Sequence, residues 1–358
     1  MSAGQSLADG AAGVALLHLE TGNRPAAHAA LRHATSGGVS IAADASLFYG
    51  APALTFVLTA ADDSGLVRAR TVLAGGTAAV TRRRLDAAHR RIDHQQQPHY
   101  AEYDLIRGLT GLGVTLRRLG DDDLLRQVLD YLVRLTEPLN TRPGWWCWNG
   151  PQQTQPPPAG GHANFGMAHG IAGPLALLAL TLRDGITVDG HAAAITRVCR
   201  WLDTWQQHAN GVTWWPQWIT SEDYKTGRPR QAAPLRPSWC YGTPGIARAQ
   251  QLAARALSDS SRQHLAEAAF ASCVTDPAQT GRLIDRSLCH GTAGLIATAR
   301  RIAADALTPM SLSPIEDLHR QAALAQVEPA GFLAGKAGAT LAAVGTTVTS
   351  WDACLLLS

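Results

Sequence analysis

Two short stretches of the chain place soft metal ligands directly before a glycine-containing turn. Residues 239–245 (WCYGTPG) supply one thiol, and residues 289–294 (CHGTAG) supply a thiol and an imidazole. Thiolate and imidazole are ligands that zinc prefers, and a zinc ion held by three protein groups keeps a fourth position for water or substrate. Cys240, Cys289 and His290 therefore predict one open, catalytic zinc site.

Four further residues near comparable turns have types suited to proton transfer or charge stabilisation. His169 directly precedes a turn and could act as a general acid or base, with a helix-capping role as the alternative. Asp104 lies shortly before another turn, where it could orient a histidine or simply favour a helix N-terminus. Arg236 could stabilise an oxyanion, or be an ordinary surface arginine. Tyr241 could donate a proton or a hydrogen bond, or serve packing.

The turns that carry these residues belong to an internal repeat, which predicts the fold. Seven short turns containing glycine each lead into an apolar stretch rich in alanine and leucine, and they begin at Gly10, Gly50, Gly108, Gly170, Gly242, Gly291 and Gly335. Amphipathic stretches alternate with them, at residues 24–35, 66–92, 122–138, 191–208, 260–275 and 313–326. The pattern predicts an all-α fold without a sheet: an α/α toroid, or barrel, of seven inner and about seven outer helices.

We expect this ring to close within a single domain, residues 1–358, because an open array needs polar capping repeats and neither end has one. The inner-helix N-termini would then gather at one rim, where their free N–H groups favour negative charge. The glycines alternatively serve only the packing of neighbouring repeats. Two tryptophan-rich loops, at residues 143–161 and 211–237, depart from the repeat and are candidates for binding loops or for seals of the barrel end.

Composition excludes several classes of protein. A net charge of +3 with mixed signs gives no basis for nucleic-acid binding, and no apolar run is long enough for membrane insertion. No early stretch resembles a secretory signal, so we expect a cytoplasmic protein with reduced cysteines. Outside the candidate zinc site, Cys199, Cys273 and Cys354 are expected to be packing residues, and Cys147, in a tryptophan loop, is a weak candidate for chemistry.

The sequence resembles the lanthionine synthetase C-like family, the LanC lanthipeptide cyclases, in three motifs: GMAHG (166–170), WCYG (239–242) and CHG (289–291). Further matching motifs extend from residue 6 to Asp352. The resemblance implies a seven-fold α/α toroid. It also implies that Cys240, Cys289 and His290 bind one Zn²⁺. His169 is then the acid–base histidine and Asp104 its supporting aspartate, with an arginine and a tyrosine beside the zinc at Arg236 and Tyr241.

The activity that the resemblance implies is thioether ring formation by a stand-alone cyclase. A cysteine of a dehydrated precursor peptide adds to dehydroalanine or dehydrobutyrine, and (methyl)lanthionine results. A lanthipeptide dehydratase and a membrane transporter are candidate further partners. Two alternatives stay open: a transferase that adds glutathione to dehydroamino acids, and a non-catalytic toroid that acts as a scaffold for a synthetase complex.

Overall fold

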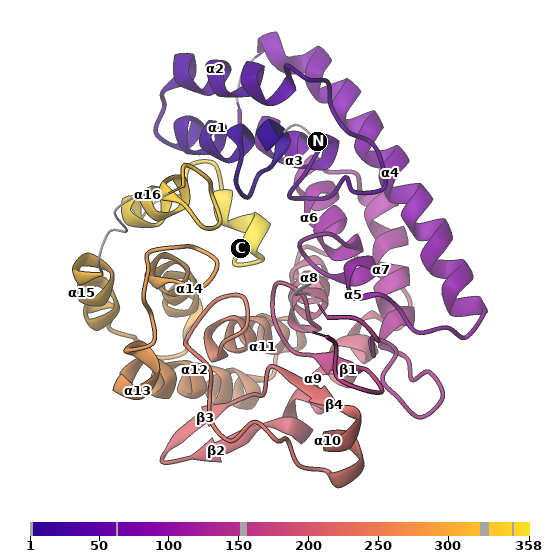
Figure 1. Ribbon diagram of the computed structural model, residues 1–358, viewed down its shortest axis with the longest axis vertical. Helices are drawn as coiled ribbons and strands as arrows, with labels where there is room; N and C mark the ends of the chain where they lie inside the picture. The colour runs from indigo at the N-terminus through magenta and orange to yellow at the C-terminus, as the bar shows by residue number, and fades with distance from the viewer. Residues whose placement is uncertain (1–2, 62–63, 151–155, 323–328, 346) are drawn as a thin grey trace.

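Seven inner helices form a closed ring in the computed structural model, which describes residues 3–61, 64–150, 156–322, 329–345 and 347–358. Each begins at one of the seven predicted turns. They are α1 (Ala11–Glu20), α3 (Ala51–Leu58), α6 (Leu109–Leu119), α8 (Ala172–Arg183), α11 (Thr243–Leu257), α14 (Thr292–Asp305) and α16 (Lys336–Val344). Each packs against the next, and α16 packs against α1, so the ring closes (Figure 1). The predicted toroid is confirmed.

The amphipathic stretches form the outer layer, as predicted. They are α2 (Arg24–Thr35), α4 (Val67–Asp93), α7 (Asp122–Thr136), α9 (His191–Trp205), α12 (Ser260–Thr275) and α15 (Ser313–Gln321). Three of them have an N-cap residue whose side chain accepts a hydrogen bond from a backbone N–H of the first turn, which favours the start of a helix at that position. These N-cap residues are Asn23, Asp121 and Asp259. The end of the last predicted stretch, 323–326, lies outside the described residues. None of the described helices combines the length and the apolar character needed to cross a membrane.

The chain after α16 differs from the two-helix pattern of the other repeats. In the described residues it forms no outer helix and instead makes a short 3₁₀ turn, η3 (Trp351–Leu355). The smaller helical segments elsewhere are η1 (Ala3–Gln5), η2 (Ser64–Leu66), α5 (Tyr100–Tyr103), α10 (Ser221–Thr226) and α13 (Pro277–Thr280).

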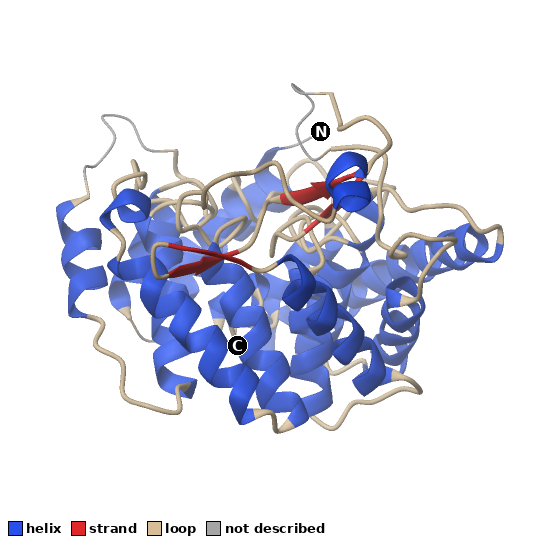
Figure 2. Ribbon diagram, turned by 90° about the horizontal axis from the view of Figure 1, so that it is seen from below, coloured by secondary structure: helices blue, strands red, loops and turns tan. Residues whose placement is uncertain are grey.

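Two small β-ribbons accompany the helices, although no stretch of the sequence predicted a sheet. β1 (His162–Asn164) pairs with β4 (Trp218–Thr220), and β2 (Gln207–Ala209) pairs with β3 (Val212–Trp214), both antiparallel. Both lie on one side of the helical body (Figure 2). Strands of three residues are too short to show alternation in a sequence. α9 consequently ends at Trp205, before the residue 208 expected from the sequence.

Backbone hydrogen bonds join neighbouring turns around one rim of the toroid, and we call this set the rim ladder. In each, a residue shortly before one inner helix donates its N–H to the carbonyl of the corresponding segment in an adjacent repeat. The pairs are Leu7 to Phe48 (3.0 Å), Leu105 to Ala168 (3.1 Å), Ala168 to Cys240 (3.4 Å), Cys240 to Cys289 (3.2 Å), Cys289 to Leu333 (2.9 Å) and Leu333 to Ala8 (2.9 Å). The ladder brings equivalent residues of successive repeats side by side.

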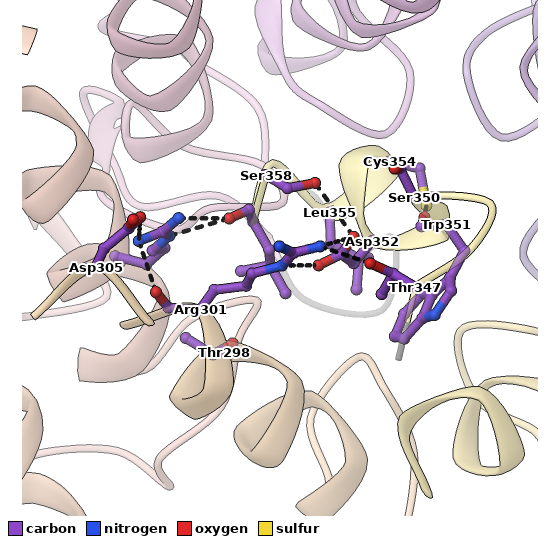
Figure 3. Close-up of polar contacts among 12 residues, drawn as sticks. Thr298, Arg301, Asp305, Thr347, Ser350, Trp351, Asp352, Cys354, Leu355 and Ser358 are labelled. Carbon is purple, nitrogen blue, oxygen red and sulfur yellow. Dashed lines mark hydrogen bonds and ion pairs between the residues drawn. The ribbon is translucent and has the colours of Figure 1, made fainter. Parts of the chain in front are cut away.

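The central lumen of the toroid is filled by the segment that follows α16. Leu355, Leu356 and Leu357 are buried, and the C label lies inside the ring in Figure 1. Figure 3 shows Arg301 of α14 paired with Asp352 of this segment, at 2.5 and 2.9 Å. The carbonyl of Leu357 accepts two hydrogen bonds from the buried guanidinium of Arg248, at 3.1 and 2.6 Å.

Candidate active site

The rim ladder places the three predicted zinc ligands together. Cys240 and Cys289 occupy the same place in successive turns, and the hydrogen bond from Cys240 N–H to the carbonyl of Cys289 holds these turns side by side. Ligand atoms of Cys240, Cys289 and His290 all lie within 4.8 Å of one another. Cys240 is buried, whereas Cys289 and His290 are half-buried. Two sulfurs and one imidazole nitrogen at this separation fit the donor set of a zinc ion that keeps one position open.

The two thiols share a proton, and nearby positive charge favours the ionised form. The Cys289 thiol donates a hydrogen bond to the Cys240 sulfur, and this lowers the pKa of Cys240 against the opposing effect of burial. Ser238, whose hydroxyl lies 3.7 Å from the same sulfur, and the charge of Arg236 act in the same direction. Hydrogen bonding to Cys240 and burial raise the pKa of Cys289. Burial and Arg236 lower the pKa of His290, so its imidazole is available as a neutral ligand.

His169 and Asp104 form the second half of the site. His169 Nδ1 lies 2.6 Å from Asp104 Oδ2. The other carboxylate oxygen accepts the backbone N–H groups of Arg107 and Gly108, both at 2.7 Å. Asp104 is 0% exposed, whereas the His169 side chain is 22% exposed. A fully buried aspartate therefore fixes the ring of His169, and the part of the chain that the structure describes shows no hydrogen-bond partner for the other ring nitrogen, Nε2.

Tyr241 and Arg236 lie between these two halves. The Tyr241 ring centroid is 6.2 Å from that of His169, and its hydroxyl accepts a hydrogen bond from Asn164 Nδ2 at 3.1 Å. Burial raises the pKa of Tyr241, so its hydroxyl keeps its proton. Arg236 is half-buried and acts on Cys240 and the neighbouring ligands through its charge. All seven predicted site residues thus belong to one continuous region of the rim.

Sequence reasoning missed three residues that support this region. Asp285 Oδ2 lies 3.4 Å from His290 Nε2, while Oδ1 of the same side chain accepts the N–H of Ser287 at 2.8 Å. Ser238 contacts Cys240, and Asn164 holds Tyr241. A carboxylate shortly before a turn, as at Asp104, was an available signal for Asp285. Nothing comparable marked the serine or the asparagine.

The remaining cysteines are not part of the candidate ligand group, and the side chain of each is buried: Cys147, Cys199, Cys273 and Cys354. Cys147, the weak candidate, has its sulfur 3.3 Å from His162 Nδ1. Burial nevertheless raises the pKa of Cys147 to about 12, so it is a neutral thiol at physiological pH. Trp145, Trp146, Trp214 and Trp215 of the tryptophan loops are buried, whereas Trp148 is exposed.

A closed double layer of helices with a Cys₂His group at one rim defines the class: an α/α toroid with a candidate metal centre. The chain belongs to the family described as lanthionine synthetase C-like protein, because that family's model matches residues 2–356.

Two known proteins show how far this similarity extends. Nisin biosynthesis protein NisC of Lactococcus lactis subsp. lactis is 27% identical over 203 residues, and the alignment spans 54% of this chain and 48% of that protein. The match therefore covers about half the length of the curated relative. The solved structure of a nisin cyclase superposes with a TM-score of 0.83 at 21% identity, over 100% of this chain and 93% of the other. This likeness supports the toroid fold.

Proposed function

We propose that this protein is a zinc-dependent lanthipeptide cyclase. Its substrate is a precursor peptide that carries cysteine and dehydroalanine or dehydrobutyrine, and its product contains (methyl)lanthionine thioether rings. The convergence of Cys240, Cys289 and His290 within 4.8 Å carries this proposal. Membership of the lanthionine synthetase C-like family and the similarity to Nisin biosynthesis protein NisC support it.

The three ligands would hold one Zn²⁺, which when bound supplies a Lewis acid that lowers the pKa of the substrate thiol. The protein's own groups would handle the proton. Asp104 accepts the Nδ1–H of His169, so Nε2 is the nitrogen that takes the proton from the substrate cysteine. The sulfur electron pair then forms the C–S bond at the β-carbon, and the electrons of the alkene move toward the carbonyl oxygen as an enolate.

The enolate gains a proton at its α-carbon, which completes an isomerisation without loss of atoms. His169 Nε2–H returns the proton that it took, and Tyr241, which keeps its hydroxyl proton, is the alternative donor. Arg236 supplies positive charge beside the ligands, where negative charge on the substrate would develop. The ring centroids of His169 and Tyr241 lie 6.2 Å apart, so the two candidate donors are neighbours in the site.

The test incubates the zinc-loaded protein with a dehydrated peptide that contains cysteine. Ring closure leaves the mass unchanged, so the readout is loss of alkylatable thiol together with ring-specific fragmentation. We expect Cys289→Ala to lose both bound zinc and ring formation, and the matched control Cys273→Ala, a buried cysteine outside the site, to keep both. Normal ring formation by Cys289→Ala would leave a scaffold role, and glutathione adducts without rings would indicate a transferase.

A further inference from the structure

A groove on the same rim lies beside the candidate active site and takes no part in the proposed chemistry. It has a volume of about 820 Å³, within the range of ligand-binding pockets. Its walls come from the segments before α1, α3 and α6, from α5, and from one face of α4. Apolar side chains form much of its lining, including Ala8, Phe48, Ala87 and Ile106. Such a surface favours apolar side chains of a ligand over water.

The groove continues the rim positions that carry the site. Tyr49 and Ile106 line it, and each directly follows a residue of the rim ladder, Phe48 or Leu105. His169, Tyr241 and His290 have the same place after Ala168, Cys240 and Cys289. One ring of equivalent positions thus runs from the groove to the candidate zinc ligands.

Direct contacts join the two regions at the inner end of the groove. Arg107 lines the groove, and its backbone N–H donates to Asp104, the partner of His169. The ring of His99, another lining residue, lies 4.7 Å from that of Tyr100, which in turn lies 5.5 Å from His169. A ligand in the groove would therefore reach the acid–base pair without leaving the protein surface.

Positive charge predominates at the groove. Arg84 and Arg107 line the groove. On α4, Arg83 lies four residues before the lining residue Ala87, and Arg90 lies three residues after it. Both therefore share the helix face of Ala87. Within the described part of the chain, none of these four arginines has an ion-pair partner at hydrogen-bonding distance.

The carboxylates near the groove do not balance this charge. Glu102 is already paired with Arg91 at 2.6 Å and accepts a hydrogen bond from Tyr131. Asp44 in the lining, Asp86 on α4 and the buried Asp104, whose charge acts on Arg84, remain. Four arginines against three carboxylates leave a net positive charge at the border of an apolar floor.

We propose that this groove binds a non-reacting segment of the substrate peptide, an extended stretch in which carboxylate side chains accompany apolar ones. The inference rests on the proposed function and adds to it the place and the chemistry of substrate recognition. The apolar floor buries the apolar side chains, and the arginines pair with the carboxylates. The reacting cysteine and alkene of the same peptide then lie toward His169 and the candidate zinc ligands.

The test measures the binding affinity of two labelled dehydrated peptides by fluorescence anisotropy. The peptides differ only in their non-reacting segment: one carries aspartates and leucines, and the other carries asparagines in place of the aspartates. We expect the wild type to bind the aspartate peptide about tenfold more tightly, on the order of 1.4 kcal/mol. Added salt should reduce this preference. Ala87→Trp, at an exposed helical position, should weaken binding of both peptides about tenfold by filling the groove. Arg90→Gln with Arg107→Gln should abolish the preference for aspartate.

Matched controls lie on the outer helix α9, away from the groove. Ala192→Trp and Arg200→Gln alter exposed positions of the same residue types and should leave both affinities unchanged. Binding by Ala87→Trp as tight as that of the wild type, or equal loss in Ala192→Trp, would overturn the inference. Ring formation by the wild type on the same peptides is measured separately. If no rings form, the cyclase proposal is contradicted. If rings form and Ala87→Trp binds the peptides as tightly as the wild type, only the proposal that the groove binds the peptide is contradicted.

Discussion

Asp104 uses its two carboxylate oxygens for different purposes. One holds the turn before α6 through the N–H groups of Arg107 and Gly108, and the other faces His169 Nδ1. The first interaction is structural and needs only an acceptor. The second selects the histidine tautomer and needs a carboxylate, so the two roles can be separated by one substitution.

Asp104→Asn should slow ring formation without unfolding the protein. The amide oxygen can still accept both backbone N–H groups, but its NH₂ group would face His169 Nδ1 and favour the wrong tautomer. We expect kcat to fall about 10²- to 10⁴-fold with little change in melting temperature. The control is Asp189→Asn, at an exposed position between α8 and α9. An unchanged kcat would mean that His169 does not transfer the proton.

Zinc affinity should depend on pH through the shared thiol proton. Hydrogen bonding lowers the pKa of Cys240 and raises that of Cys289, so the free site retains thiol protons that metal binding must displace. Protons compete more strongly with the metal as pH falls, so zinc affinity should fall on acidification. Calorimetry in buffers of different ionisation enthalpy should show proton release on zinc binding, with more protons released at acidic than at alkaline pH. Zinc affinity and proton release that do not change with pH would contradict the ligand assignment.

Residue types and their places before the turns were enough to predict which side chains meet at the rim. Cys240 and Cys289 are equivalent in their repeats, and this equivalence could be seen in the sequence. The supporting contacts could not, because Asn164 reaches Tyr241 across 77 positions of the chain through the placement of β1. Such a pairing depends on a strand of three residues that leaves no pattern in the sequence.

At the scale of elements, the last glycine of a turn permits close packing of an inner helix on its own entry segment. A Cβ atom at Gly294 would lie 2.0 Å from the carbonyl oxygen of Leu288, the residue before Cys289. Backbone at this distance must shift, and the shift would move the segment that carries two candidate zinc ligands.

Gly294→Ala should therefore destabilise the protein and weaken zinc binding together. We expect a loss of about 3 kcal/mol in the free energy of unfolding, measured by urea denaturation. The matched control is Gly75→Ala in α4, where a Cβ atom would meet no neighbour within 4 Å. Because glycine is a poor helix former, this control should stabilise the protein by about 0.5–1 kcal/mol. Similar effects of the two substitutions would contradict the packing role.

The helices could be predicted closely because each start combines a turn with a change from polar to apolar residues. The segment after α16 could not, since Trp351–Leu355 is stabilised by two residues distant in the chain, Arg301 of α14 and Trp239 before α11, and not by its own periodicity. Its place in the lumen follows from arginines on α11 and α14, and no local signal in the sequence identifies such partners.

At the scale of the whole molecule, Arg248 links α11, α14 and the segment in the lumen. Its guanidinium donates to the carbonyl of Leu357, to Gln251 and to Asp305, and its side chain is 2% exposed. Arg248→Met preserves much of the volume and removes the guanidinium that donates to the carbonyl of Leu357 and to Gln251, whereas Asp305 keeps its ion pair with Arg255. We expect unfolding free energy to fall by about 3–5 kcal/mol in a urea titration.

Arg255→Met provides the comparison, because Arg255 pairs with the same Asp305 but is 25% exposed. Solvent screening limits the contribution of such a pair to about 1 kcal/mol or less. Equal losses for Arg248→Met and Arg255→Met would show that burial of the guanidinium in the lumen has no special role.

The filled lumen also constrains how a substrate travels. Leu355–Leu357 are buried inside the ring, and the Arg248 side chain donates a hydrogen bond to the carbonyl of Leu357. We therefore expect the peptide of the proposed reaction to enter and leave over the rim that carries the candidate ligands, and not to thread through the toroid. A substrate with a bulky tag at both ends, or one joined into a circle, should consequently be processed as readily as a linear one.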